Sequence, residues 1–191
     1  MTPYVQQELS LNLLSCGYFG GLGRMESLLN VYLAGKIRKD CWRHKIVAGL
    51  RDHHWSLGHL PQDKFTYVGP FFVGCDHGCY HQPNSHGNGI SCWPDQDTDK
   101  QEVGRLCREA VSNADLVFCF IDSLDCYGTI AEIERANTLG IRVVIAFAHG
   151  IATEDNNELW FVCTSAYRIY YNICECKLPG LLKVAIEEFS W

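Results

Sequence analysis

The chain has 191 residues, a formal net charge of −6 and a pI of about 5.7. This acidic balance argues against a nucleic-acid backbone as the primary partner. No apolar run approaches membrane-spanning length, and the first residues lack the basic and then apolar pattern of a signal peptide, so we expect neither a membrane partner nor secretion. The length predicts one domain over residues 28–191, preceded by an extension over residues 1–27.

The cysteine content points to a reducing compartment. There are 11 cysteines, an odd number, and several lie inside apolar runs, as Cys107, Cys119 and Cys163 do. Disulfide frameworks usually belong to shorter secreted chains with loop cysteines. We therefore expect mostly reduced thiols in a cytoplasmic protein.

The first half of the domain predicts two strands and a helix. Residues 28–34 form an apolar run typical of a buried strand. Apolar residues then recur at helical spacing, which predicts a helix near residues 40–53. Phe65–Val68 predicts a second, short strand.

A long loop over residues 69–97 follows. Loops of this size are usually functional or disordered, and its aromatic and cysteine content argues against simple disorder. It contains Cys75-x-His77-x-Cys79-x-His81, whose side chains are of the kinds that zinc prefers, although the alternating spacing is unusual for zinc. A metal site and a wall of the ligand site are both open. We predict the wall, with Asp76 and His77 near the ligand and no bound metal.

The second half alternates helices and strands. Thr98-x-x-Gln101 fits a capping box that opens a helix. Further strands are expected at residues 116–121, 141–148 and 158–166, and further helices at residues 127–140 and 180–190. This alternation predicts a single α/β domain with a five-stranded, mostly parallel sheet and helices on both faces, of flavodoxin or Rossmann type.

The loop after residues 116–121 holds the strongest candidate site. It carries Asp122 and Asp125, and the next helix brings Glu132 into its first turn. In an open parallel sheet, ligands bind in the crevice beyond the carboxyl ends of the strands. Thr129-x-x-Glu132 also fits a capping box, so a structural and a catalytic role for Glu132 both remain open.

Three short segments resemble one family when taken in order. They are Val31-Tyr32-Leu33-Ala34-Gly35-Lys36-Ile37, then Ala114-Asp115 before an apolar strand, and Tyr127-Gly128-Thr129-x-x-Glu132 at a helix start. Together they resemble the nucleoside 2-deoxyribosyltransferase superfamily, which includes the deoxynucleoside monophosphate N-glycosidases. The resemblance covers roughly residues 28–150.

The resemblance implies an enzyme that cleaves or transfers the N-glycosidic bond of a nucleoside or nucleotide. It implies no cofactor, and it suggests a homo-oligomer, because family members commonly complete their sites across a dimer interface. Glu132 would attack the anomeric carbon and form a glycosyl ester, which water or a second base resolves, as in the two-step chemistry of retaining glycosidases. Tyr32 would position Glu132 or the sugar, and Gly35 and Lys36 would meet the ligand.

Other residues near these segments are candidate ligand contacts. Lys36, Arg38 and Arg43 form a basic turn that is able to hold a phosphate, although it is also compatible with a solvated helix start. Gly128 allows close approach of a ligand at the helix start, and Thr129 follows it.

Two positions depart from the family pattern. Cys107 and Cys126 stand where the family usually has aspartates, so we expect Asp125 or Asp122 to hold sugar hydroxyls or to help protonate the leaving base. The rival hypothesis is a nucleotide-binding or sensor protein that uses the same crevice without catalysis. A zinc-dependent hydrolase built on the Cys/His loop is a third.

Overall fold

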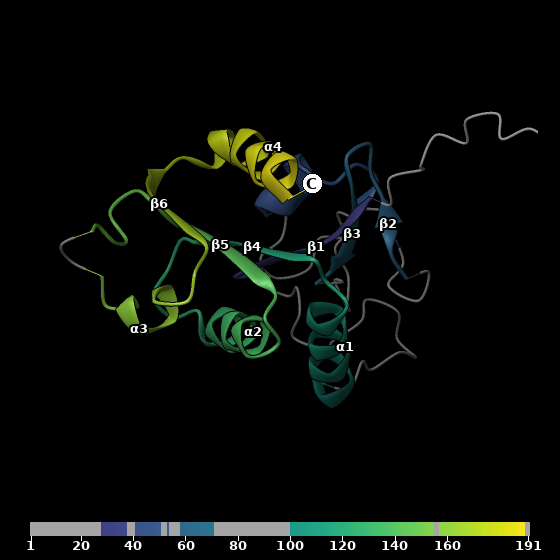
Figure 1. Cartoon of the computed structure of the whole chain (residues 1–191), viewed down its shortest axis with the longest axis horizontal. Coiled ribbons are helices and arrows are strands. Elements are labelled where there is room, and N and C mark those ends of the chain that lie inside the picture. Colours follow the sequence, from purple (N-terminus) through teal and green to yellow (C-terminus); the bar gives the residue numbers. More distant parts are fainter. Residues whose placement is uncertain are drawn as a thin grey trace, which may run out of the picture.

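The computed structural model describes residues 28–37, 41–50, 53, 58–70, 100–154 and 157–189. Within these ranges the chain forms one mostly parallel sheet with helices on both faces (Figure 1). The predicted α/β class is confirmed, and the sheet has six strands rather than five. The extension over residues 1–27 and nearly all of the loop over residues 69–97 lie outside the described residues.

The elements follow one another as expected for alternating α/β structure. The strands are β1 (Leu29–Gly35), β2 (Leu60–Pro61), β3 (Phe65–Gly69), β4 (Leu116–Ile121), β5 (Arg142–Ala148) and β6 (Arg168–Ile173). The helices are η1 (Trp42–Lys45), α1 (Lys100–Ser112), α2 (Tyr127–Thr138), α3 (Trp160–Cys163), η4 (Glu175–Lys177) and α4 (Leu178–Phe189). None of these helices has both the length and the apolar character that crossing a bilayer requires.

The strand order creates a switch point between β1 and β4. The order is β2-β3-β1-β4-β5-β6, with β2 antiparallel to β3 and the other neighbours parallel. The chain leaves β1 toward β3 on one side and later returns through α1 to β4 on the other side of β1. Ligand crevices in open α/β sheets form where the chain direction reverses in this way.

Both faces of the sheet are apolar, because helices cover both. Alternate residues of β4 point to opposite layers: Phe118 and Phe120 join the core under η1 and α4, while Val117 and Cys119 join the core under α1 and α2. Figure 1 shows α4 on one face and α1, α2 and α3 on the other. Trp42 belongs to the same core as Phe118 and Phe120, and its ring centroid lies 5.8 Å from that of Phe120.

Two sequence predictions of secondary structure were wrong. Residues 158–166 do not form a strand: the short helix α3 lies there, and the last strand, β6, begins only at Arg168. Where the structure describes the segment near residues 40–53, it forms the 3-10 turn η1 and further turns rather than an α-helix. The antiparallel strand β2 was missed, and its Pro61 is tolerated because the strand lies at the sheet edge.

Candidate active site

A pocket lies at the switch point, beyond the carboxyl ends of β1 and β4. Its volume is about 260 Å³. The end of β1 and the start of α2 supply the lining residues, which are Gly35, Lys36, Ile37, Asp125, Cys126, Tyr127, Gly128, Thr129 and Glu132. A pocket is thus present at the crevice that the sequence indicated.

The wall formed by the end of β1 is shaped by a buried arginine. Arg43 has no exposed surface, and its guanidinium donates to the backbone carbonyls of Leu33 (2.7 Å), Gly35 (2.7 Å) and Lys36 (3.4 Å). The N–H groups of the guanidinium thus donate to backbone carbonyls at the pocket wall. The phosphate-binding role expected of Arg43 has no support in this geometry.

Gly35 is required where this wall meets β4. Its φ of +150° is rarely adopted by residues with a side chain, and an added Cβ would lie 2.7 Å from the Phe120 carbonyl oxygen. Gly35 therefore lies directly against β4 and, together with Lys36, lines the pocket.

Glu132 lies at the floor of the pocket and is held by Tyr32. The Tyr32 hydroxyl donates to Oε1 of Glu132 at 2.5 Å, although the two residues are 100 positions apart. Tyr32 is fully buried in β1 and does not line the pocket, so of the two roles expected for it, positioning the carboxylate fits the geometry.

The position of Glu132 differs from the expectation in one respect. It lies five residues after Tyr127, the first residue of α2, and so belongs to the second helical turn rather than the first. The residue that caps α2 is Cys126, which makes no side-chain capping bond. Thr129 and Glu132 therefore do not form a capping box, and the structural interpretation of Glu132 as a cap was wrong.

Burial makes Glu132 titrate near neutral pH. Desolvation raises its pKa to about 7, while the hydrogen bond from Tyr32 and the positive charge of Arg43 oppose the increase. The pKa of Tyr32 is raised well above its usual value by burial and by the Glu132 charge, so its hydroxyl stays protonated and remains a donor. A carboxyl group with this pKa can act as a nucleophile, a base or an acid at physiological pH.

Cys107 of α1 completes the inner side of the site. Its thiol interacts with the Tyr32 hydroxyl, and burial together with the nearby Glu132 charge raises its pKa to about 11. It is therefore a neutral thiol at physiological pH and adds no second negative charge beside Glu132.

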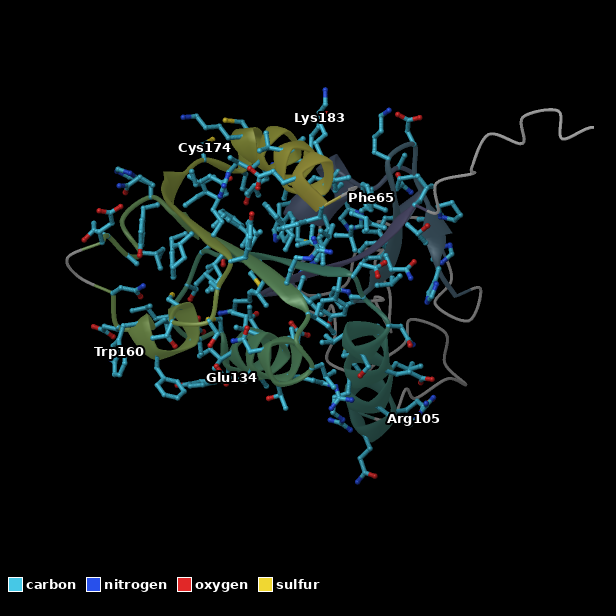
Figure 2. All side chains as sticks on the ribbon, viewed as in Figure 1. Phe65, Arg105, Glu134, Trp160, Cys174 and Lys183 are labelled. Atoms are coloured by element: carbon cyan, nitrogen blue, oxygen red, sulfur yellow. The ribbon has the colours of Figure 1, made fainter. Side chains whose placement is uncertain are left out.

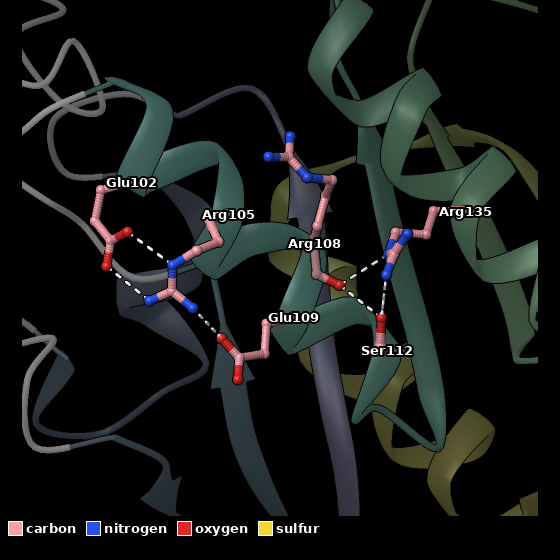
Figure 3. A network of polar contacts seen from close by, with 6 residues as sticks. All are labelled: Glu102, Arg105, Arg108, Glu109, Ser112 and Arg135. Atoms are coloured by element: carbon pink, nitrogen blue, oxygen red, sulfur yellow. Dashed lines mark hydrogen bonds and ion pairs between the residues drawn. The ribbon is translucent and has the colours of Figure 1, made fainter.

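Helices α1 and α2 are fixed to each other by a polar network (Figure 3). Arg135 of α2 donates to the Arg108 carbonyl at 2.8 Å and to the Ser112 hydroxyl at 2.7 Å on α1. Along α1 itself, Arg105 bridges Glu102 and Glu109. Because Cys107 and Glu132 lie on these two helices, the network helps to fix the two side chains that interact with Tyr32.

The mouth of the pocket carries an ion pair. Lys36 donates to Oδ2 of Asp125 at 2.5 Å, and Ser123 donates to the other oxygen of the same carboxylate. These two bonds lower the pKa of Asp125. Asp125 is thus an acceptor able to hold hydroxyl groups, and its low pKa does not suit the expected protonation of a leaving base.

The remaining predicted residues divide into three groups. Gly128 and Thr129 line the pocket, as expected. Asp122 follows β4 but is not among the residues that line the pocket. Arg38, Asp76 and His77 lie outside the described residues, as does the Cys/His loop.

Sequence reasoning missed three pocket residues, Ile37, Cys126 and Tyr127. Tyr127 is the most informative, because its side chain is 79% exposed at the rim of the pocket. Its place immediately before Gly128, at the helix start, was the available signal. Among the described residues, no group of three His, Cys, Asp or Glu side chains is arranged to hold a metal ion.

Comparisons with known proteins add little to this geometry. No protein-family model matches the chain, and no curated protein matches it. A similar solved structure is described as "Crystal structure of conserved protein from Enterococcus faecalis V583", with 18% identity and a TM-score of 0.42 over 85% of this chain and 98% of that chain. This similarity is too distant to inform the function.

Proposed function

We propose that this chain cleaves or transfers the N-glycosidic bond of a nucleoside or nucleotide, with Glu132 as the nucleophile. The observation that carries the proposal is the 2.5 Å hydrogen bond from buried Tyr32 to Glu132 at the floor of the switch-point pocket. A carboxylate held in one orientation by a hydroxyl that stays protonated is suited to attack a fixed carbon atom.

The proposed reaction has two steps. An ionised Glu132 oxygen bonds to the anomeric carbon while the bond to the base nitrogen breaks and the base leaves with the electron pair. Water, or a second base, then attacks the same carbon and releases the carboxylate. Asp125 accepts hydrogen bonds from the sugar hydroxyls, since its low pKa keeps it ionised.

The pocket suits a small ligand with an aromatic part. Its volume of about 260 Å³ is a little below the roughly 300–1,000 Å³ typical of drug-sized ligands. The exposed ring of Tyr127 offers a surface on which a base can stack. Lys36 and the amino end of α2 both present positive charge to the pocket, which favours an anionic group such as a 5′-phosphate.

A base-release assay tests the proposal. The purified protein is incubated with ribonucleosides, deoxynucleosides and their 5′-monophosphates, and free base is measured by liquid chromatography. We expect release from at least one substrate, and a loss of about a thousandfold or more in Glu132→Gln. A KM that is lower for monophosphates than for nucleosides, with a difference that shrinks as salt is added, would support phosphate binding by Lys36.

Glu134→Gln is the matched control. Glu134 lies on the same helix, is labelled in Figure 2 and does not line the pocket. This variant should keep wild-type turnover. Tight nucleotide binding with no release of base by the wild type would instead favour the non-catalytic alternative.

A further inference from the structure

Two exposed thiols face each other at the surface, away from the pocket. Cys174 follows β6 and Cys176 lies in η4, and both side chains are exposed. Figure 2 labels Cys174 at the surface between β6 and α4. The Cys176 thiol donates to the Cys174 sulfur at 2.7 Å, and the backbone N–H of Cys176 donates to the same sulfur at 3.3 Å.

This arrangement makes the two thiols unequal. The hydrogen bonds from Cys176 lower the pKa of Cys174, while donation toward Cys174 raises the pKa of Cys176. The other cysteines of the described residues differ: Cys41, Cys119, Cys126 and Cys163 are buried and Cys107 is half-buried. An accessible thiol stabilised as a thiolate beside a second thiol is the usual arrangement for exchange with a disulfide.

The segment is also held in place by an ion pair. Glu175, between the two cysteines, accepts a hydrogen bond from Lys45 of η1 at 2.7 Å. The positive charges of Lys45 and Lys177 lie close enough to interact with the thiols. Cations beside a thiol favour its ionised form.

We infer that Cys174 and Cys176 form a dithiol site that exchanges with small-molecule disulfides and closes reversibly into a Cys174–Cys176 disulfide. The site lies outside the pocket, and its chemistry does not depend on the proposed glycosidic activity.

The exchange is balanced in two steps. The Cys174 thiolate attacks one sulfur of the external disulfide, whose S–S bond breaks and releases one thiolate. The Cys176 sulfur, after losing its proton, then attacks Cys174 and releases the second thiolate. The protein dithiol is oxidised by two electrons, the external disulfide is reduced to two thiols, and the two thiol protons pass to these products.

Peptide mapping after treatment with glutathione disulfide tests the inference. The reduced full-length protein is incubated with this disulfide, blocked with an alkylating agent, unfolded and digested with trypsin. Cleavage after Arg168 and Lys177 isolates residues 169–177, whose cysteines are Cys174 and Cys176 alone. We expect this peptide to lose two hydrogen atoms and to regain them with dithiothreitol.

The digest contains its own control. The peptide over residues 109–135 also has two cysteines, Cys119 and Cys126, and both are buried. It should remain unmodified under the same conditions. Equal modification of the two peptides, or no closure of the 169–177 peptide, would overturn the inference.

Single variants identify the attacking thiol. Cys176→Ser should stop at a mixed disulfide of glutathione with Cys174, because the second step has no thiol. Cys174→Ser should react at Cys176 about tenfold more slowly, because Cys176 lacks the stabilisation of its thiolate. If wild type accumulates only mixed disulfides, or if the two variants react at the same rate, the assigned roles are wrong.

Discussion

At the scale of single residues, one half-buried carboxyl group is subject to two opposed influences. Burial favours the neutral form of Glu132, while Tyr32 and Arg43 favour its ionised form, and the pKa comes to about 7. Near physiological pH both forms are therefore populated. A nucleophile must be ionised, so the proposed reaction should speed up as the pH rises through this value.

Tyr32→Phe tests this balance. The substitution removes the hydrogen bond that stabilises the Glu132 anion, so the pKa of Glu132 should rise. In the wild type, we expect kcat/KM to increase with pH with a midpoint near 7. In the variant the midpoint should move upward by about one unit, and the maximal rate should fall by about tenfold to a hundredfold.

Tyr171→Phe controls for the loss of a hydroxyl group. Tyr171 lies on β6 and stacks on Phe147, far along the sheet from β1. Its pH profile should match that of the wild type. An unchanged midpoint in Tyr32→Phe would show that the hydrogen bond does not tune Glu132.

At the scale of elements, the end of β1 and the two residues after it build one wall of the site. Arg43 is fully buried, and its guanidinium donates hydrogen bonds to the backbone carbonyls of Leu33 and Gly35 at the end of β1. A buried charge is tolerated only when its donors are satisfied, and here the backbone satisfies them. These bonds hold the end of β1 in place, with Gly35 directly against β4.

Gly35→Ala should destabilise the protein because its Cβ would collide with backbone. The Cβ would lie 2.7 Å from the Phe120 carbonyl oxygen and 3.3 Å from the Arg43 guanidinium. We expect the free energy of unfolding in urea to fall by at least about 2 kcal/mol. Gly128→Ala is the matched control, because no atom lies within 4 Å of the added Cβ, and its stability should change by less than about 1 kcal/mol. Wild-type stability in Gly35→Ala would contradict this account of the end of β1.

The elements that the sequence predicted best are those buried on both faces. Every residue of β4 is buried, and so are the central residues of β5, so their apolar runs carry a clear signal. The edge strand β6 is only half-buried and contains Arg168 and Asn172, which weaken its pattern. The last strand was instead predicted at residues 158–166 because of the apolar run Trp160–Cys163, although Trp160 and Phe161 are exposed.

The sequence indicated where the candidate site lies, but not which side chains contact one another there. The position of Glu132 after β4 pointed to the crevice where the pocket lies, whereas its bond to Tyr32 joins residues 100 positions apart. No local pattern reveals such a contact. Arg43 was likewise interpreted from the sequence as a surface cation. Its backbone partners belong to β1, and the contact forms only when β1 and η1 pack together.

At the scale of the whole molecule, the site places an ionisable group inside an otherwise apolar layer. Tyr32 and Ile133 belong to the core between the sheet and helices α1 and α2, and Glu132 adjoins both. Functional groups of this kind usually reduce the stability of the fold that carries them. For Glu132 the cost depends on pH, because only the ionised form is penalised by burial.

The stability of Glu132→Gln relative to wild type should therefore change with pH. The folded pKa of Glu132, about 7, lies above the value of about 4.3 expected when the chain is unfolded. Its stabilising contribution is fully present below the lower value and is lost as the pH rises through 7, whereas glutamine does not titrate. Between pH 4 and pH 8, the difference in unfolding free energy should shift by about 3 kcal/mol in favour of the variant. Urea denaturation across this range measures the shift, and Glu134→Gln should show none. A shift in the opposite direction would mean that Glu132 is stabilised as an anion and that its pKa lies below the usual range.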